Sequence, residues 1–296
     1  MLITYWLSTL NSHYTLINSD LTPDSLTINF PFREFNHAIL IVPLSKDTLW
    51  LDNTDNLSPC GYINSYIQNR EAFVIDGLNS KIIRCPAKTA IENLNVKKYD
   101  FQVEDNNRTL LSANYSYKGR NYEFYNYLKS GASEYEQDQY IHKRFAYFNC
   151  DSLSWNLTHK YIDSAQIDLS ARIIFTDFFK HIDKSILLPY LQVSIPDFQT
   201  PVKRTLPVFL PFPLYERDTI VYHIPRNSVI KCQPEIKTII TEYGKYYCEI
   251  KITTDCITLI KDLLIKPAYI PLSGYRNFYQ FITSIQEFEK KVIVLN

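Results

Sequence analysis

An aliphatic run that ends in a polar turn and a second short strand constrains this chain most. Residues 38–44 are almost all aliphatic, which is typical of a buried strand. Residues 45–47, Ser-Lys-Asp, have turn chemistry, and residues 48–52 resume strand character. The pattern predicts a hairpin whose turn is centred near Ser45. In that hairpin, odd-numbered positions of the first strand pair with even-numbered positions of the second.

The hairpin brings two side chains of chemical interest toward each other. His37 precedes the first strand and Asp52 ends the second, so the predicted register places both on one face, opposite or diagonal. An imidazole held by a carboxylate is the orienting half of a nucleophilic triad, because the carboxylate fixes the tautomer and stabilises the imidazolium. A histidine and an aspartate near hairpin ends are also common in structural roles. Spacing alone does not separate the two interpretations.

A wider set of residues carries a resemblance. Phe35-Asn36-His37, the aliphatic strand and then Trp50-Leu51-Asp52-Asn53-Thr54 resemble the histidine and aspartate strands of the transglutaminase-like superfamily. Residues 56–75, with Pro-Cys-Gly-Tyr at 59–62 and Arg-Glu-Ala-Phe-Val-Ile at 70–75, are similar to the closing segment of one subgroup. That subgroup comprises multidomain bacterial proteins, typical of Bacteroidetes, with domains of unknown function around a papain-like core. The resemblance implies a Cys-His-Asp triad in which His37 and Asp52 are catalytic.

The nucleophile implied by the resemblance is missing from these residues. In the family it begins a helix upstream of the histidine strand, and residues 1–10 resemble the tail of that helix. No cysteine precedes His37. The first cysteine, Cys60, lies in a Pro-Cys-Gly loop without a helix N-terminus to stabilise a thiolate, so we interpret it as a loop or packing residue. The chain is therefore expected to resemble the C-terminal part of such a protein and to be inactive by itself.

Composition excludes some functions. Lys plus Arg and Asp plus Glu both total 31, and this zero net charge argues against nucleic acid or an anionic membrane as the main partner. No apolar run approaches the roughly 18–20 residues of a membrane span. Aromatic residues make up 15% and glycines number only 6, which favours a sheet-rich fold with tyrosines packed in the core and across strands.

Cysteines and the remaining histidines give no further site. None of the six cysteines has zinc-ligand spacing, so we predict no metal and no cofactor. We interpret most of the cysteines as small buried side chains, with Cys248 and Cys256 able to face each other across a hairpin. The other histidines show no telling spacing to an acidic residue, and we interpret them as satisfied or surface groups: His13, His142, His159, His181 and His223.

The fold class that we predict is α+β in two parts. Residues 1–86 form the C-terminal part of a transglutaminase-like (papain-like) domain. Residues 87–296 form a β-rich, sandwich-like region with inserted helices, as one or two subdomains. Its expected elements are long antiparallel strands, the first with alternating apolar positions from Val96 to Val103, a helix capped by Ser133, a turn at residues 180–184 and a terminal helix ending near Glu289. Residues 201–296 resemble the C-terminal domain of the same bacterial subgroup.

Two functions of different classes remain open. The resemblance implies acyl transfer, by hydrolysis or aminolysis, on a protein or peptide substrate in the full-length protein, which relatives often export to the periplasm or cell envelope. The alternative is a non-catalytic binding or structural protein on a β-rich scaffold. A sheet without its N-terminal helices would expose apolar surface, so self-association is also expected.

Overall fold

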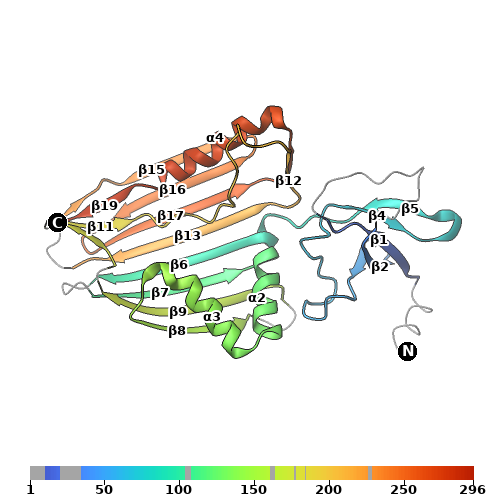
Figure 1. Cartoon of the computed structure of the whole chain (residues 1–296), viewed down its shortest axis with the longest axis horizontal. Helices are drawn as coiled ribbons and strands as arrows, with labels where there is room; N and C mark the ends of the chain where they lie inside the picture. Colours follow the sequence, from blue (N-terminus) through green and yellow to red (C-terminus); the bar gives the residue numbers. More distant parts are fainter. Residues whose placement is uncertain are drawn as a thin grey trace.

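The computed structural model describes two differently built regions along an elongated molecule. A small sheet from the N-terminal residues lies at one end, and a much larger sheet with helices forms the rest (Figure 1). The secondary structure is a β-rich mixture of strands and helices, which confirms the predicted α+β class. The residues described are 11–20, 35–103, 108–160, 164–176, 178–183, 185–225 and 229–296, so the expected helix over residues 1–10 lies outside them.

The small sheet contains the predicted hairpin. Its five strands are antiparallel and follow the order β3-β2-β1-β4-β5. In the hairpin, Ile41 pairs with Trp50 and Pro43 with Thr48, as the turn chemistry predicted. The sheet buries a small apolar cluster that includes Ile39, Trp50 and Val74. The strands are β1 (His13–Ile17), β2 (His37–Pro43), β3 (Thr48–Leu51), β4 (Glu71–Val74) and β5 (Lys81–Arg84).

The large sheet has eight strands in the order β15-β16-β17-β13-β6-β7-β9-β8. Among the strand pairs of the described residues, β6 and β13 are parallel, whereas sequence analysis predicted antiparallel strands. This pair joins two antiparallel halves of the sheet. The strands are β6 (Leu94–Val103), β7 (Arg108–Tyr117), β8 (Ser152–His159), β9 (Ile167–Thr176), β13 (Leu214–His223), β15 (Glu235–Thr241), β16 (Gly244–Ile252) and β17 (Cys256–Ile265).

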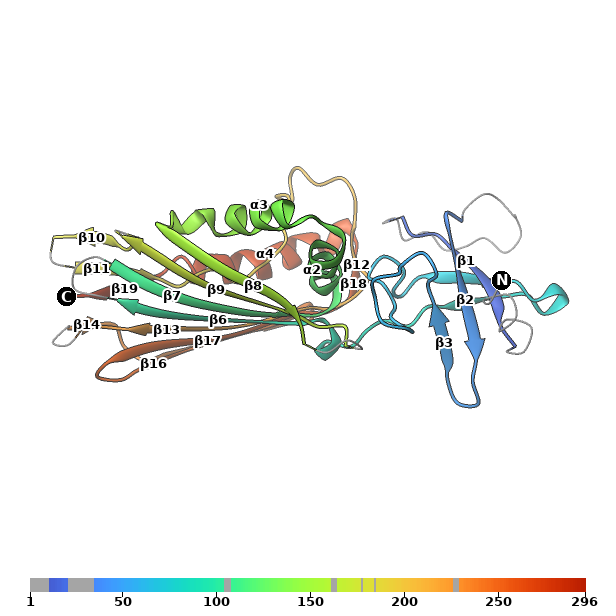
Figure 2. The ribbon, with the colours of Figure 1, turned by 90° about the horizontal axis from the view of Figure 1, so that it is seen from below.

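Helices and a second, four-stranded sheet cover one face of the large sheet (Figures 1 and 2). The predicted Ser133 cap is present as a capping box with Glu136, and the terminal helix ends one residue before Glu289. The helices are α2 (Gly119–Gly131), α3 (Glu134–Phe145) and α4 (Leu272–Phe288). The four-stranded sheet contains β10 (Lys180–Ile182), β11 (Ser185–Pro189), β14 (Ile230–Lys231) and β19 (Val292–Leu295), and β12 (Val208–Leu210) pairs with β18 (Ala268–Ile270).

Aromatic side chains fill the space between the large sheet and its covering layer. Phe101 is fully buried and its ring lies near those of Phe175, Phe179 and Tyr222. This packing agrees with the core role predicted for the aromatic residues. Other tyrosines with almost no exposed surface are Tyr117, Tyr122, Tyr246 and Tyr275.

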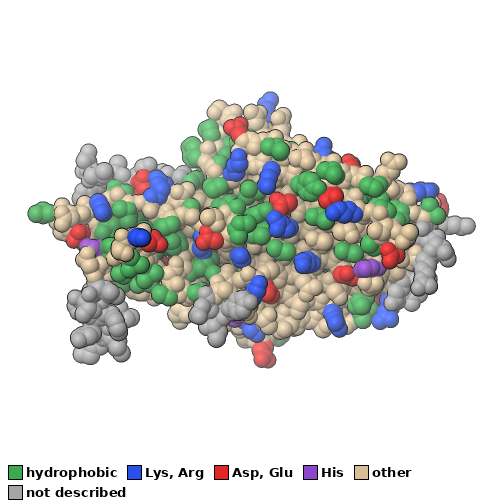
Figure 3. Space-filling view, turned by 180° about the vertical axis from the view of Figure 1, so that it is seen from behind, with side chains coloured by type: hydrophobic (Ala, Val, Ile, Leu, Met, Phe, Trp, Pro, Cys, Tyr) green, Lys and Arg blue, Asp and Glu red, His purple; other side chains and the backbone are tan. Residues whose placement is uncertain are grey.

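None of the helices and strands that the structure describes covers the opposite face of the large sheet (Figure 2). On this face positive, negative and hydrophobic side chains are mixed, and no large patch of one charge is visible (Figure 3). On β8, β9 and β7 this face carries mainly small polar residues, and a shallow cavity there is lined by Ser112, Asn114, Ser154, Asn156 and Ser170. No helix in the part of the chain that the structure describes is both long and apolar enough to cross a membrane.

Two local predictions were wrong. Residues 180–184 were expected to form a turn, but Lys180–Ile182 is a strand that pairs with β11, so the turn is shorter. In β6 the apolar residues that were predicted to alternate do not all lie on one face of the strand. Asn95 and Lys97 are buried on the covered side with Phe101, whereas Val96 alternates to the other side. The strand therefore carries a lysine toward the core, where an alternating pattern predicts an apolar residue.

Candidate active site

The structure brings His37 and Asp52 together at the end of the hairpin. His37 begins β2, and Asp52 directly follows β3. The distance between His37 Nε2 and Asp52 Oδ2 is 3.0 Å, which is a hydrogen bond. The His37 side chain is 13% exposed and that of Asp52 is 3% exposed. Strand β1 supports this corner because Ile17 pairs with His37.

Asp52 accepts hydrogen bonds from three residues. The Tyr66 hydroxyl donates to the same oxygen as His37, at 2.6 Å. The Thr54 amide and hydroxyl donate to the other oxygen, at 3.0 and 2.7 Å. Burial alone would raise the pKa of the Asp52 carboxyl, but the hydrogen bonds from Tyr66, Thr54 and His37 together hold that pKa below its ordinary value. Asp52 is therefore an ionised carboxylate at neutral pH.

This charge state fixes which nitrogen carries the proton when the His37 ring is neutral. An ionised carboxylate only accepts hydrogen bonds, so Nε2 of His37 must carry the proton that the bond uses. Nδ1 of the neutral ring then keeps a lone pair, which is the group that can accept a proton from a thiol or hydroxyl. The ring of Tyr66 stands edge-on to that of His37, with centroids 5.4 Å apart, and limits rotation of the imidazole.

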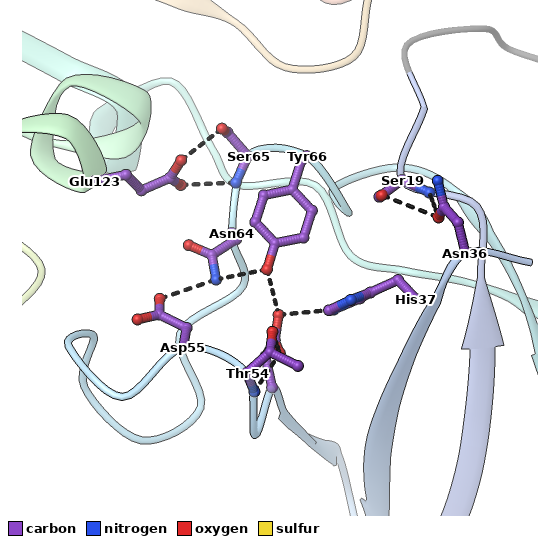
Figure 4. A network of polar contacts seen from close by, with 10 residues as sticks. Ser19, Asn36, His37, Thr54, Asp55, Asn64, Ser65, Tyr66 and Glu123 are labelled. Carbon is purple, nitrogen blue, oxygen red and sulfur yellow. Dashed lines mark hydrogen bonds and ion pairs between the residues drawn. The ribbon is translucent and has the colours of Figure 1, made fainter. Parts of the chain in front are cut away.

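A chain of hydrogen bonds connects this corner to helix α2. Asn64 donates to Asp55 at 3.0 Å and contacts the Tyr66 hydroxyl at 3.4 Å. Its neighbour Ser65 donates its amide and hydroxyl to Glu123 on α2, at 2.7 and 2.6 Å (Figure 4). The segment that carries Tyr66 is thus fastened to the large region.

Sequence analysis did not identify Tyr66 or Glu123. Glu123 contacts Ser65 across 58 positions of the chain, and Tyr66 bonds Asp52 across 14 positions through a loop. No spacing rule within one element predicts such a pair. The Tyr-Ile-Gln sequence at 66–68 gives no signal of its own.

None of the six cysteines is joined to His37 by a hydrogen bond, and all six are free thiols within the described residues. Cys60 is exposed and borders a different cavity with Gly61, Lys88 and Gln166. The expectation that most cysteines are buried was wrong, because only Cys85 and Cys248 are. The pairing of Cys248 with Cys256 is also wrong, since the strand register sets Cys248 opposite Lys261 and Cys256 opposite His223.

Three of the histidines that we interpreted as satisfied or surface groups lie near carboxylates, although their spacing in the sequence gave no sign of it. His223 is 3.1 Å from Asp100, His142 is 3.3 Å from Asp138, and His13 is 3.7 Å from Asp76. The partners of His223 and His13 come from other strands or loops, so sequence spacing hides them. Within the described residues no group of three or more His, Cys, Asp or Glu side chains is arranged to hold a metal ion.

Comparisons with known proteins give a family match to part of the chain and a structural alignment over most of it. A family model described as a domain of unknown function, DUF3858, matches residues 184–295, which lie in the large region and exclude His37 and Asp52. A search of curated proteins gives no match. A crystal structure of a "putative protease" from Parabacteroides distasonis aligns with a TM-score of 0.46 and 8% identity. The alignment covers 97% of this chain and 40% of that one. The chain thus spans well under half the length of that protein.

Proposed function

We propose that His37 and Asp52 are the base and the orienting carboxylate of a transglutaminase-like Cys-His-Asp site. The observation that carries the proposal is the 3.0 Å bond between His37 Nε2 and a carboxylate kept ionised by Tyr66 and Thr54. The resemblance of residues 35–75 to that superfamily supports it. In this proposal residues 1–86 are the C-terminal part of the catalytic domain, and residues 87–296 are an accompanying β-rich region.

The chemistry follows from the protonation state. The thiol proton passes to Nδ1 of His37, the thiolate attacks an amide carbonyl, and Asp52 stabilises the resulting imidazolium. His37 then returns the proton to the leaving amine, which leaves an acyl-thioester. Water or a second amine releases the acyl group, with His37 acting again as base. The reaction class is acyl transfer on a protein or peptide, by hydrolysis or aminolysis.

The proposal requires a thiol from outside these 296 residues. All six cysteines are accounted for and none bonds His37. A thiol that starts a helix above the Nδ1 side of His37 would gain the acidity that helix N-termini confer on cysteine. The polypeptide of 296 residues is accordingly expected to have no acyl-transfer activity by itself.

The test begins with the gene upstream of the Met1 codon. An open frame that encodes a cysteine at a helix start defines the longer protein, which is then labelled with an alkyne-tagged iodoacetamide. We expect labelling of that cysteine to fall about 10²–10⁴-fold in His37→Ala, the usual size of a general-base effect. Cys60→Ala is the matched control and should label normally. Unchanged labelling in both His37→Ala and Asp52→Ala, or a stop codon directly upstream, contradicts the proposal.

A non-catalytic binding or structural role is the second candidate. It is favoured by the absence of any cysteine partner for His37 among the described residues, and by the uncovered face of the large sheet. In this case the His37–Asp52–Tyr66 network only fastens loops. Asp52→Ala would then lower stability without changing any function of the folded protein.

Self-association of the 296-residue chain remains a consequence of the proposal. If helices of the catalytic domain cover the small sheet in the full-length protein, their loss exposes apolar surface. Sizing chromatography should show oligomers at micromolar concentration that the upstream extension abolishes. A clean monomer without the extension would count against a missing covering layer.

A further inference from the structure

A cavity in the large region, far in sequence from His37, is bordered by an arginine for which the described residues supply no acidic partner. The cavity has a volume of about 550 Å³ and lies where the end of α3 meets the segments 189–192 and 289–292. This volume falls within the range of small-molecule sites, about 300–1,000 Å³. Its walls combine aromatic residues, including Tyr99, Tyr115 and Tyr147, with Arg144.

Charges at this cavity do not balance locally. Of the cations that line it, Lys290 pairs with Glu287 at 2.6 Å and Lys291 with Glu235 at 2.9 Å. No carboxylate among the described residues lies within ion-pair distance of Arg144. Its Nη2 donates to the Tyr117 hydroxyl at 2.6 Å, and its Nε is buried without an acceptor. Arg144 is thus the cation at this cavity that lacks a counter-charge.

The one carboxylate in the cavity wall is already engaged. Glu289 accepts hydrogen bonds from Lys261 and Tyr246 at one oxygen, both at 2.8 Å. Its other oxygen accepts the amide of Val193 at 2.7 Å. The buried carboxylates of β13, Glu216 and Asp218, make their ion pairs with Lys97 and not with Arg144. A ligand anion would therefore meet an unsatisfied guanidinium rather than a competing acid.

Tyrosine rings hold the guanidinium in place. The Arg144 Cζ lies 4.9 Å from the Tyr115 ring centroid and 5.7 Å from those of Tyr117 and Tyr125. Tyr117 and Tyr125 are themselves stacked, with centroids 4.4 Å apart. A planar cation fixed by ring contacts loses little entropy when its fork binds a carboxylate.

We propose that this cavity, which we call the Arg144 cavity, binds an organic carboxylate that carries an aromatic or branched apolar group. The carboxylate takes the free donors of Arg144 in a bidentate arrangement. The apolar group packs against Tyr99, Tyr147 and Phe148. Neither the His37 site nor the family match assigns this role.

The experiment measures binding of N-acetyl-L-phenylalanine to the full chain by calorimetry, with N-acetyl-L-phenylalaninamide as the matched neutral probe. We expect saturable binding of the acid, and at least about tenfold weaker binding of the amide. A tetrapeptide with a C-terminal phenylalanine acid is a third probe. Its binding identifies the end of a peptide chain as a source of the carboxylate, whereas binding of the free acid alone identifies a small metabolite; both agree with the proposal.

Variants separate the carboxylate contact from mere packing. Arg144→Lys keeps the positive charge but loses the planar pair of N–H donors. It should weaken binding of the acid about tenfold or more and leave binding of the amide unchanged. Tyr147→Ala removes a side chain that is 72% exposed, so the fold should persist while both probes bind more weakly. Lys143→Gln, next to Arg144 and exposed, is the control. Equal binding of acid and amide, no saturable binding, acid binding insensitive to Arg144→Lys, or preferential binding of inorganic phosphate would each overturn the proposal.

Discussion

Two buried aspartates, one in each region, show opposite responses to burial. Asp52 beside the small sheet accepts four hydrogen bonds, and its pKa lies below the ordinary value. Asp218 on β13 of the large sheet has a buried oxygen without a hydrogen bond, and Lys97 is 3.7 Å away. Burial raises the pKa of Asp218, and the attraction of Lys97 offsets only part of that rise, so the pKa is about 6.

At Asp52 the hydrogen-bond donors outweigh the effect of burial on the pKa, whereas at Asp218 burial outweighs the attraction of Lys97. The two regions also differ in what holds them together. The large region has an extended aromatic core, whereas the small sheet has a modest apolar cluster and a fully bonded polar corner. The large region can therefore tolerate an imperfectly satisfied charge. In the small region the charged carboxylate of Asp52 lies within hydrogen-bond distance of His37.

The largest expected effect tests the reliance of the large region on its aromatic core. Phe101→Ala removes a fully buried ring that contacts several others, and should lower the free energy of unfolding by about 3–5 kcal/mol. Urea denaturation followed by circular dichroism measures the loss. Tyr135→Ala, at a position 72% exposed, should change stability by less than about 0.5 kcal/mol. A small effect of Phe101→Ala would contradict the claim that the aromatic core stabilises the large region.

Asp218→Asn tests whether the buried charge of Asp218 lowers the stability of the large region. Because the folded pKa of about 6 exceeds the ordinary 3.8, the folded state binds this proton more tightly, and stability falls as pH rises between these values. The asparagine variant should lack this fall, and at neutral pH should be more stable than the natural chain by up to about 3 kcal/mol. Denaturation curves at acidic and neutral pH give both numbers. Equal pH profiles would show that Lys97 neutralises Asp218 fully.

Tyr66→Phe tests the polar corner of the small region. Losing a hydrogen bond to a charged acceptor should lower stability by about 1.5–3 kcal/mol at neutral pH and raise the pKa of Asp52. The stability that comes from a lowered carboxyl pKa exists above pH 3.8 and disappears as pH falls through the folded pKa. The difference between variant and natural chain should therefore shrink in acid. Tyr14→Phe, on β1 and 60% exposed, is the control.

The smallest expected effect is local to α3 of the large region. Ser133→Ala removes the capping box with Glu136 and should lower stability by about 1 kcal/mol. Ser133→Asp keeps an acceptor for the Glu136 amide and should restore most of the loss. Proton resonances of His37 should not move in either variant. Movement there would mean that the two regions are coupled more tightly than their separate cores suggest.

Local features of the fold and the site were predictable from sequence. Turn chemistry at Ser45 fixed the register of one hairpin, and that register alone predicted the approach of His37 and Asp52. The Ser133 cap and the terminal helix were equally readable, because their signals lie within a few residues.

Features that depend on contacts between segments far apart in the sequence were not predictable. Tyr66 and Glu123 join the site through tertiary contacts, and the parallel pairing of β6 with β13 has no local signal. Lys97 and Lys261 are charged residues within strands and would normally be assigned to solvent. Their carboxylate partners come from β13 and from the end of α4, so only the assembled fold explains their burial.

The parallel pair has a consequence for the order of folding. Each half of the large sheet is made of strands that are close along the chain, but their junction joins Asn95 to Glu216 across 121 positions. Contacts of this separation form late and slowly, so the two halves should assemble first and dock afterwards. At the junction Asn95 faces Glu216 and Lys97 faces Asp218. A shifted docking would bury Lys97 without a partner, so the same charges that strain the finished fold select its register during assembly.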